Sequence, residues 1–258
     1  MKLTFLGTGT SFGVPQIGCD CAVCTSHDPR DRRTRVGAVV ETDQGRRLLL
    51  DTPPELRLQL IAAGIAHVDA VLYTHDHADH THGIDDLRAF TARAAQPLTV
   101  YASAATVSAL ARKFPYIFDD ELRALPGTFK PEGRLRVLDA DETVAIAGVD
   151  VTPVRVPHGF AEVFAYRIGP LAYVTDAKSV PDAAIARLTG ARVLVLNALF
   201  RTPHPTHLSI PEALEVAARV GAERTYLTHL THRYPHAELE AELPPDVRPA
   251  HDGLVVEI

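Results

Sequence analysis

The densest group of reactive side chains lies in the segment 74–80, which reads Thr-His-Asp-His-Ala-Asp-His. It follows the apolar run Val-Leu-Tyr, which is typical of a buried β-strand. Because alternate side chains of an extended segment point the same way, His75 and His77 can bind one metal ion. If the chain then turns into a helix, Asp79 and His80 can face a second metal ion close by. The spacing therefore predicts a centre for two metal ions at the end of a strand.

Such a centre needs further ligands, and the same order of residues recurs elsewhere: an apolar strand followed by a histidine or an aspartate. His158, Asp176 and His229 each follow such a run, and the Asp176 carboxylate is suited to bridging two cations. Asp51 follows three leucines in the same way and could orient a ligand through a hydrogen bond. This mixture of imidazole and carboxylate groups accepts Mn²⁺, Fe²⁺ and Zn²⁺.

The three cysteines of the chain form a second cluster, at Cys19, Cys21 and Cys24. An odd number of cysteines at this spacing suits disulfide bonds poorly, and a reducing compartment disfavours them further. Three thiolates within six residues predict a tetrahedral zinc site whose fourth ligand comes from elsewhere in the chain.

Short apolar runs and capping signals predict the elements that position these residues. Strands are expected at 2–6, 36–41, 46–50, 70–73, 98–101, 134–138, 149–156, 163–168, 171–174, 192–196, 224–227 and 254–258. Helices are expected at 55–63, 104–113 and 211–220, the last opened by Ser209 with Glu212 in a capping box and closed by Gly221. Early strands look like hairpins and later ones alternate with helices, which predicts packed sheets with helices outside.

Length and composition limit the class of protein. With 258 residues, 46% hydrophobic and 22% charged, the chain can bury a large core, and disorder is excluded. No apolar run approaches the length of a membrane span and the N-terminal apolar stretch is short, so we expect a cytoplasmic protein. A net charge of −6 argues against broad nucleic-acid binding. We expect solvated surface positions for two further groups, the mixed charges of segment 28–35 and four histidines: His27, His67, His236 and His251.

Together these residues resemble the motif series of the metallo-β-lactamase superfamily, over nearly the whole chain from the segment 5–10, Phe-Leu-Gly-Thr-Gly-Thr, to the last strand. The resemblance implies an α/β fold, the αβ/βα four-layer sandwich, as a single domain over 1–258. It implies that a hydroxide between two metal ions is the nucleophile. The implied ligands are His75, His77 and His158 for one ion, Asp79, His80 and His229 for the other, and Asp176 as the bridge.

Further motifs of the sequence resemble one branch of this superfamily. The runs Gly-Thr-Gly-Thr-Ser at 7–11 and Gly-Val-Pro at 13–15, with the cysteine loop at 18–24, resemble the phosphodiesterase branch related to ribonuclease Z. They are most similar to the phosphoribosyl cyclic phosphate phosphodiesterases. This resemblance implies that His232 completes a structural zinc site with the three cysteines. It also implies catalytic roles for Asp79 and for His207, with His207 as the general acid that protonates the leaving group.

We therefore expect a metal-dependent phosphodiesterase, a hydrolase with two divalent metals (Mn or Zn) and one structural zinc, acting on a small phosphate ester, cyclic esters included. One alternative is a ribonuclease Z-like tRNA endonuclease, but the sequence has no long basic insertion to grip tRNA. The same residues leave room for a hydrolase of a β-lactam or thioester. They also leave room for a non-catalytic metal-binding protein of cofactor biosynthesis, such as the B protein of pyrroloquinoline quinone synthesis. We expect a small-molecule partner rather than nucleic acid, and no membrane; the sequence leaves a homodimer open.

Overall fold

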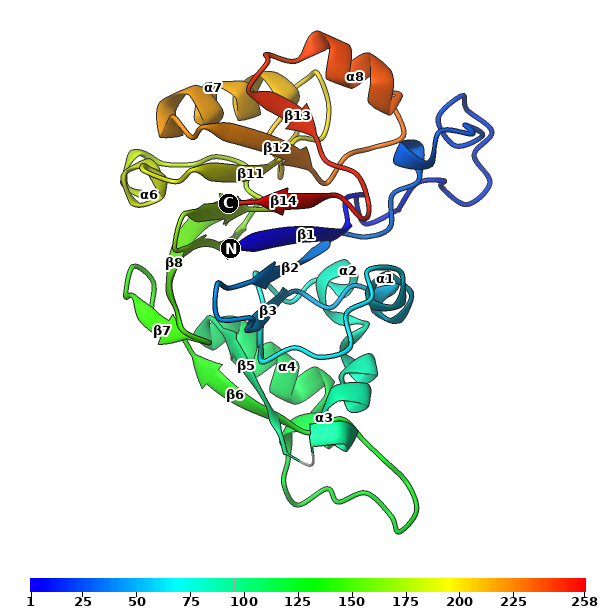
Figure 1. The fold of residues 1–258 in the computed structure, drawn as a ribbon, viewed down its shortest axis with the longest axis vertical. Helices are drawn as coiled ribbons and strands as arrows, with labels where there is room; N and C mark the ends of the chain where they lie inside the picture. The colour runs from blue at the N-terminus through cyan, green and yellow to red at the C-terminus, as the bar shows by residue number, and fades with distance from the viewer. Residues whose placement is uncertain (95) are drawn as a thin grey trace.

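Two mixed β-sheets form the centre of the molecule. The computed structural model describes residues 1–94 and 96–258, where each sheet has seven strands (Figure 1). The first sheet runs in the order β14 (Val255–Glu257), β1 (Lys2–Gly7), β2 (Gly37–Glu41), β3 (Arg47–Leu50), β4 (Ala70–Leu72), β5 (Leu98–Ala102) and β6 (Gly133–Val137). The second runs β13 (Val247–Pro249), β12 (Arg224–Thr228), β11 (Val193–Asn197), β10 (Leu171–Val174), β9 (Ala161–Ile168), β8 (Val149–His158) and β7 (Val144–Ile146).

Each sheet joins an antiparallel half to a parallel half. Strands β14, β1, β2 and β3 are antiparallel neighbours, and β3 to β6 are parallel. In the second sheet β7 to β10 are antiparallel, and β10 to β13 are parallel. Parallel strands need crossover connections, which bring helices onto the outer faces.

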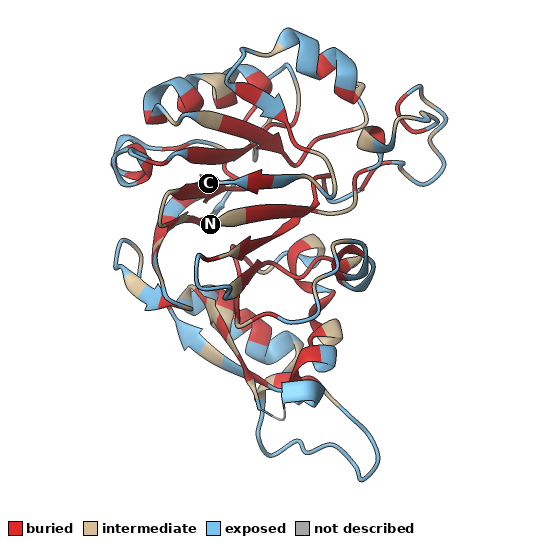
Figure 2. Ribbon diagram, viewed as in Figure 1, coloured by how far each residue is buried: buried red, intermediate tan, exposed pale blue. Residues whose placement is uncertain are grey.

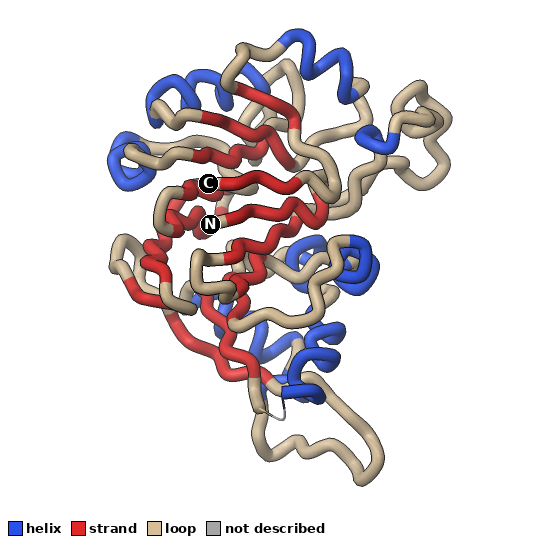
Figure 3. The backbone as a smooth tube through the Cα atoms, in the orientation of Figure 1, coloured by secondary structure: helices blue, strands red, loops and turns tan. Residues whose placement is uncertain are grey.

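The helices form the two outer layers (Figures 1 and 3). Beside the first sheet lie α1 (Leu56–Ala62), α2 (Ala78–Thr81), α3 (Arg88–Ala94), α4 (Ala104–Lys113) and α5 (Pro115–Phe118), with the 3₁₀ turn η2 (Ile84–Leu87). Beside the second lie α6 (Asp182–Leu188), α7 (Ile210–Val220) and α8 (His236–Glu242). A further 3₁₀ turn, η1 (Pro29–Asp31), lies in the loop between β1 and β2. Within the described residues, even the longest helix, α7 with 11 residues, is too short to cross a membrane.

Alternate residues of the parallel strands supply different apolar layers. In β3, Leu48 and Leu50 belong to the core between the sheets, whereas Leu49 packs under the helices. In β11, Val195 faces the central core and Leu196 faces the helices of the second sheet. Both faces of these strands are buried, as Figure 2 shows, which explains their continuous apolar runs. The four-layer αβ/βα sandwich expected from the sequence is confirmed.

Most predicted elements are confirmed within a residue or two, including the helix at 211–220. The Ser209–Glu212 capping box is present, and Gly221 ends the helix in the left-handed conformation (φ 68°). Two strands, β7 and β13, and helices α3, α5 and α6 were not predicted. Each has at most seven residues, too few for a periodic pattern to stand out from its surroundings.

The expectation that segment 28–35 is wholly solvated is wrong, as is the surface position expected for His236. Arg33 is 1% exposed and His236 is 2% exposed. The Arg33 guanidinium donates to Thr8 Oγ1 (3.0 Å) and to the Ala250 carbonyl (2.5 Å), and it lies 3.0 Å from His236 Nδ1. Burial lowers the pKa of Arg33 to about 10. The charge run is therefore not a free loop, because one of its members links the segment to both ends of the chain.

Gly7 is required where β1 meets the segment after the cysteine loop. A Cβ at this position would overlap the Arg35 carbonyl oxygen and the Gln59 amide. We expect Gly7→Ala to lower the free energy of unfolding in urea by about 1–3 kcal/mol, because the backbone cannot move apart without breaking the pairing of β1 with β2. Ala105→Ser, which adds one atom at an exposed position of helix α4, is the control and should change the free energy of unfolding by less than about 0.5 kcal/mol. Equal losses for the two variants would contradict a steric role for Gly7.

Candidate active site

Five of the predicted site residues lie at or just after the ends of strands. Asp51 follows β3, and His75 follows β4. His158 is the last residue of β8, Asp176 follows β10, and His229 follows β12. All five are at most 6% exposed. Asp51 and His75 come from the first sheet, and the other three residues come from the second. The site therefore lies where strand ends of both sheets meet.

Three of these residues adopt a backbone conformation that side chains other than glycine seldom adopt. Asp51, Asp176 and His229 have φ values of 62°, 61° and 56°. The left-handed conformation costs about 1–2 kcal/mol for a residue with a Cβ. Such residues persist where surrounding structure holds them, and they concentrate at functional sites. Here each turns the chain sharply at the end of a buried strand.

The segment after β4 turns into a helix directly. His77 is the N-cap of α2, with an extended backbone, and Asp79 and His80 lie within the helix. Asp79 is in the first helical turn, where the helix dipole favours a negative charge. The helix carries Asp79 and His80 to the same site as His75, as the spacing suggested.

The side chains form two adjoining groups of potential metal ligands. One contains His75, His77, His158 and Asp176, and the other contains Asp79, His80 and His229. Within each group the ligand atoms lie within 4.8 Å of one another. This is the division expected from the resemblance, with Asp176 near both groups: its carboxylate lies 3.8 Å from His75 Nε2 and 3.6 Å from His229 Nε2.

The chemistry of the donor atoms fits metal ions. Among the described residues, His75 Nε2, His80 Nε2 and both ring nitrogens of His229 are buried without a hydrogen-bond partner. Buried polar atoms without partners are costly, by about 1–3 kcal/mol each, unless something else binds them. Imidazole nitrogens next to carboxylates are ligands for divalent transition metals. The cluster is therefore suited to hold metal ions.

Hydrogen bonds fix the orientation of three of these histidines. His80 Nδ1 donates to Asp51 Oδ2 at 2.7 Å, and Asp51 also accepts from the Thr74 amide and hydroxyl, both at 2.8 Å. His75 Nδ1 donates to Thr74 Oγ1 at 3.0 Å. His158 Nδ1 donates to the Thr206 carbonyl at 2.8 Å. In each case Nε2 remains free to bind metal, which is the usual way a protein sets the tautomer of a ligand histidine.

The buried charges influence one another strongly. Burial acts to raise the pKa of Asp176, but the charges of His229 and His80 outweigh it and hold that pKa well below its usual range. Burial and the charge of His80 hold the pKa of His75 well below its usual value. For His80, the effect of burial is outweighed by Asp176 and Asp51, which raise its pKa. The Asp176 carboxylate is thus ionised and able to bind a cation at neutral pH.

His207 lies beside the cluster, in the loop before α7. Its Nε2 is 3.3 Å from Asp176 Oδ2, and its Nδ1 is 2.8 Å from Thr206 Oγ1. Burial lowers the pKa of His207 to about 4. Its donor atom also lies within reach of a cation held by Asp176 and His229. The geometry therefore admits His207 either as a group that contacts the substrate or as an additional ligand.

The cysteine cluster is separate from these groups, and His232 completes it. His232 Nδ1 lies 3.3 Å from Cys19 Sγ and 3.5 Å from the sulfurs of Cys21 and Cys24. The three cysteines are free thiols, and with His232 they form one group of potential metal ligands. Three sulfurs and one imidazole are the donor set of a structural zinc site.

The cysteine loop is joined to the site through the strand that carries His229. The Leu230 amide donates to the Thr8 carbonyl at 2.9 Å, and Gly9 forms an isolated bridge with Leu230. Leu230, directly after His229, is held by this pairing, and His232, three residues after His229, is held by the cysteine cluster.

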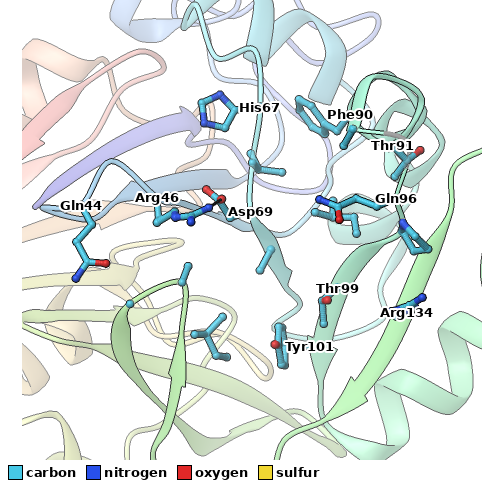
Figure 4. Close-up of a pocket in the computed structure, with 18 residues that line it drawn as sticks. Gln44, Arg46, His67, Asp69, Phe90, Thr91, Gln96, Thr99, Tyr101 and Arg134 are labelled. Carbon is cyan, nitrogen blue, oxygen red and sulfur yellow. Dashed lines mark hydrogen bonds and ion pairs between the residues drawn. The ribbon is translucent and has the colours of Figure 1, made fainter.

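A cavity of about 320 Å³ opens beside the cluster and is lined by His207 and His229. Another cavity, of about 560 Å³, lies at the opposite edge of the sheets, near the starts of β4 and β5 (Figure 4). Its polar side chains include Arg46 and Asp69, which form an ion pair at 2.7 Å. None of the predicted site residues lines it. The candidate active site therefore opens to the smaller cavity, which His207 and His229 line.

Sequence reasoning missed three residues that support the site. Thr74 and Thr206 hold ligand histidines, as described above, and both stand next to a predicted site histidine. Lys113, at the end of α4, donates to the carbonyl (2.5 Å) and carboxylate (2.7 Å) of Asp76, which lies between His75 and His77. The two threonines could have been suspected from their positions. Lys113 is 37 residues from Asp76 and has no local signal.

Comparisons with known proteins agree with this geometry. A family model described as a beta-lactamase superfamily domain matches residues 46–230. A crystal structure described as a new diphosphatase from the PhnP family is 40% identical, with a TM-score of 0.90 over 100% of this chain and 97% of that one. A ribonuclease Z from a Bradyrhizobium species is 27% identical over an alignment of 297 positions, which covers 93% of this chain and 93% of that protein.

A protein named octanoyltransferase from Porphyromonas gingivalis is 38% identical over 256 residues. The match covers 98% of this chain but 51% of that protein, so this chain spans about half the length of that relative.

The metal content of the protein tests the two kinds of site. After reconstitution with Mn²⁺ and Zn²⁺, we expect elemental analysis to find three metal ions per chain, two in the His/Asp cluster and one in the cysteine cluster. A content of one metal ion or less after reconstitution would contradict a two-metal cluster.

Cys21→Ser tests the cysteine cluster separately. We expect this variant to lose one zinc ion and to melt at a lower temperature, because the free energy of binding at such a site contributes to folding. Activity should fall mainly because His229 is held less firmly, while the other two metal ions still bind in excess metal. Ala22→Ser, an exposed neighbour in the same loop, is the control. If Cys21→Ser keeps all its zinc and its melting temperature, the structural zinc site is refuted.

Proposed function

Because this chain belongs to the metallo-β-lactamase superfamily, we propose that it is a metal-dependent phosphodiesterase that hydrolyses a small phosphate ester, cyclic esters included. The family and its relatives support a hydrolase. The observation that carries the finer proposal is the pair of adjoining ligand groups around Asp176, with unpartnered imidazole nitrogens. Two adjacent metal ions are the usual device for hydrolysing phosphate esters, since they bind both the attacking and the leaving oxygen.

We assign one ion to His75, His77 and His158 and the other to Asp79, His80 and His229, with Asp176 between them. When bound, such ions neutralise charge on the phosphoryl oxygens and lower the pKa of water. Burial acts to raise the pKa of Asp79, but the imidazoles of His229 and His80 outweigh it and hold that pKa below its usual range. The Asp79 carboxylate is therefore ionised and can accept a hydrogen bond from the attacking water.

His207 would give a proton to the oxygen that leaves. In the protein as described, burial holds its pKa at about 4, which disfavours the protonated form. A phosphodiester bound beside it adds a negative charge, and a nearby negative charge raises the pKa of an imidazole. Proton donation at neutral pH therefore depends on the bound substrate.

Two features favour a small substrate over tRNA. The cavity at the cluster has a volume of about 320 Å³. The long loop between α5 and β6, which projects from the molecule in Figure 1, has four acidic side chains in its residues 119–132 against two basic ones. An acidic projection repels a nucleic-acid backbone.

A phosphoanhydride is the second candidate bond, because the 40% identical structure is described as a diphosphatase. The same metal ligands would serve either bond, since in both the attack is on phosphorus. Hydrolysis assays with bis-p-nitrophenyl phosphate, a phosphonate diester, a diphosphate diester and nitrocefin separate these activities. Turnover of nitrocefin alone would overturn the proposal.

His207→Ala tests the general acid. With an alkyl leaving group we expect kcat to fall by about 10²–10⁴, because a poor leaving group needs the proton. With p-nitrophenolate, which leaves without help, the loss should be much smaller. Elemental analysis of the variant should find the metal content unchanged, and His27→Ala, at an exposed position, is the control. Equal losses on both substrates would indicate that His207 binds phosphate, and loss of a metal ion would identify it as a ligand.

A further inference from the structure

The cavity beside the metal cluster has an outer part that the proposed chemistry does not use. His207 and His229 form its inner wall, and Phe12, Phe200, Gln16 and Arg233 lie among its other lining residues. We propose that this outer part binds the leaving group of the substrate, and that it selects an aromatic group that carries a second negative charge. This inference rests on the proposed phosphodiesterase function and names the substrate class for that site.

The position of His207 determines which half of the substrate enters the cavity. In hydrolysis, water forms the new bond to phosphorus, the bond from phosphorus to the leaving oxygen breaks, and that oxygen takes a proton. If His207 supplies this proton, the leaving oxygen lies next to His207. The rest of the leaving group then extends into the space that His207 lines.

The walls of this space are partly aromatic. Phe12, in the loop after β1, is 71% exposed although it is a large apolar side chain. Phe200 is half-buried on the opposite segment, after β11, and Leu199 beside it is buried. An exposed phenylalanine contributes little to the core, but it offers a flat apolar face to a ligand ring. The cavity therefore suits a planar group.

The cavity also has one cation that no carboxylate neutralises. Arg233 is exposed and forms no ion pair with any of the described residues. Two other basic side chains near the site are paired: Arg35 with Glu55, and Lys178 with Glu212. Because the chain as a whole has a net charge of −6, an unpaired arginine in this cavity favours an anionic ligand specifically at this place.

The cysteine cluster holds the two segments that carry Phe12 and Arg233. The backbone N–H of Gln16 donates to Cys24 Sγ at 3.3 Å, which anchors the loop that carries Phe12. On the other side, His232 contacts the cysteine sulfurs and precedes Arg233 directly. The loop and the arginine are thus held by one cluster, so the cavity has a defined shape before any ligand binds, and preorganisation of this kind favours binding.

Two phosphodiesters test the proposal, methyl phenyl phosphate and methyl 3-carboxyphenyl phosphate. The second carries an additional negative charge on its aromatic leaving group, and the first does not. We expect the wild-type protein to have the higher kcat/KM for the carboxylated ester. Arg233→Met should lower kcat/KM for that ester about tenfold, mainly through KM, and change it little for the uncharged one. Phe12→Ala should lower kcat/KM for both esters about three- to tenfold, because both place a ring in the cavity.

Matched controls are Arg136→Met, on β6, and Phe129→Ala, in the loop between α5 and β6, which are exposed and do not line the cavity. They should change kcat/KM by no more than about twofold. The subsite is refuted if wild-type protein does not have the higher kcat/KM for the carboxylated ester. It is also refuted if Arg233→Met lowers kcat/KM equally for both esters.

If wild-type protein hydrolyses neither ester, turnover of bis-p-nitrophenyl phosphate decides the proposed function separately, and calorimetry of methyl 3-carboxyphenyl phosphate binding decides the subsite. Weaker binding to Arg233→Met than to the wild type then supports the subsite, and equal binding, or no binding to either, refutes it.

Discussion

A single buried carboxylate, that of Asp176, is the centre on which the other functional residues converge. It is 2% exposed, and five histidine Nε2 atoms lie within 4.0 Å of it, those of His75, His80, His158, His207 and His229. Bringing so many polar groups into a dry environment is unfavourable unless they are compensated. Metal ions bound to these groups would supply that compensation, and the imidazoles that lack partners are oriented to receive them.

The site depends on both sheets, because neither one contains a complete set of ligands. The first sheet and its helix α2 supply His75, His77, Asp79 and His80, and the second supplies His158, Asp176 and His229. The apolar core between the sheets, with Leu50 and Leu72 on one side and Tyr173 and Val195 on the other, fixes the distance between these two sets. Metal ions that bind residues of both sets would in turn hold the two sheets together.

The residues with strained backbone conformations lie next to the most rigid parts of the sheets. The left-handed residues Asp51, Asp176 and His229 each follow a strand that is buried on both faces, so the rigid sheet compensates for the local cost. His229 has additional support from the segment 8–10, which pairs with Leu230. The cysteine cluster and the buried Arg33 fasten the N-terminal segment to the C-terminal part of the chain. These contacts join distant parts of the sequence next to the ligand cluster.

The residue patterns of the sequence alone determined packed sheets with outer helices and the candidate ligands at strand ends, and its resemblance to the metallo-β-lactamase superfamily supplied the four-layer sandwich and the division of those ligands between two metal ions. Buried parallel strands need unbroken apolar runs, and a ligand placed just after such a run is visible locally, as at His75, Asp176 and His229. The cysteine loop was equally visible because its three thiols are close neighbours in the chain. Short elements such as α3 and β7 left no clear pattern.

Only the tertiary structure decided which residues meet. The contact of Lys113 with Asp76, the burial of Arg33 and His236, and the assembly of Phe12 and Arg233 around one cavity depend on segments far apart in sequence. No local pattern records such contacts, because they arise from how the two sheets pack and where their loops come together.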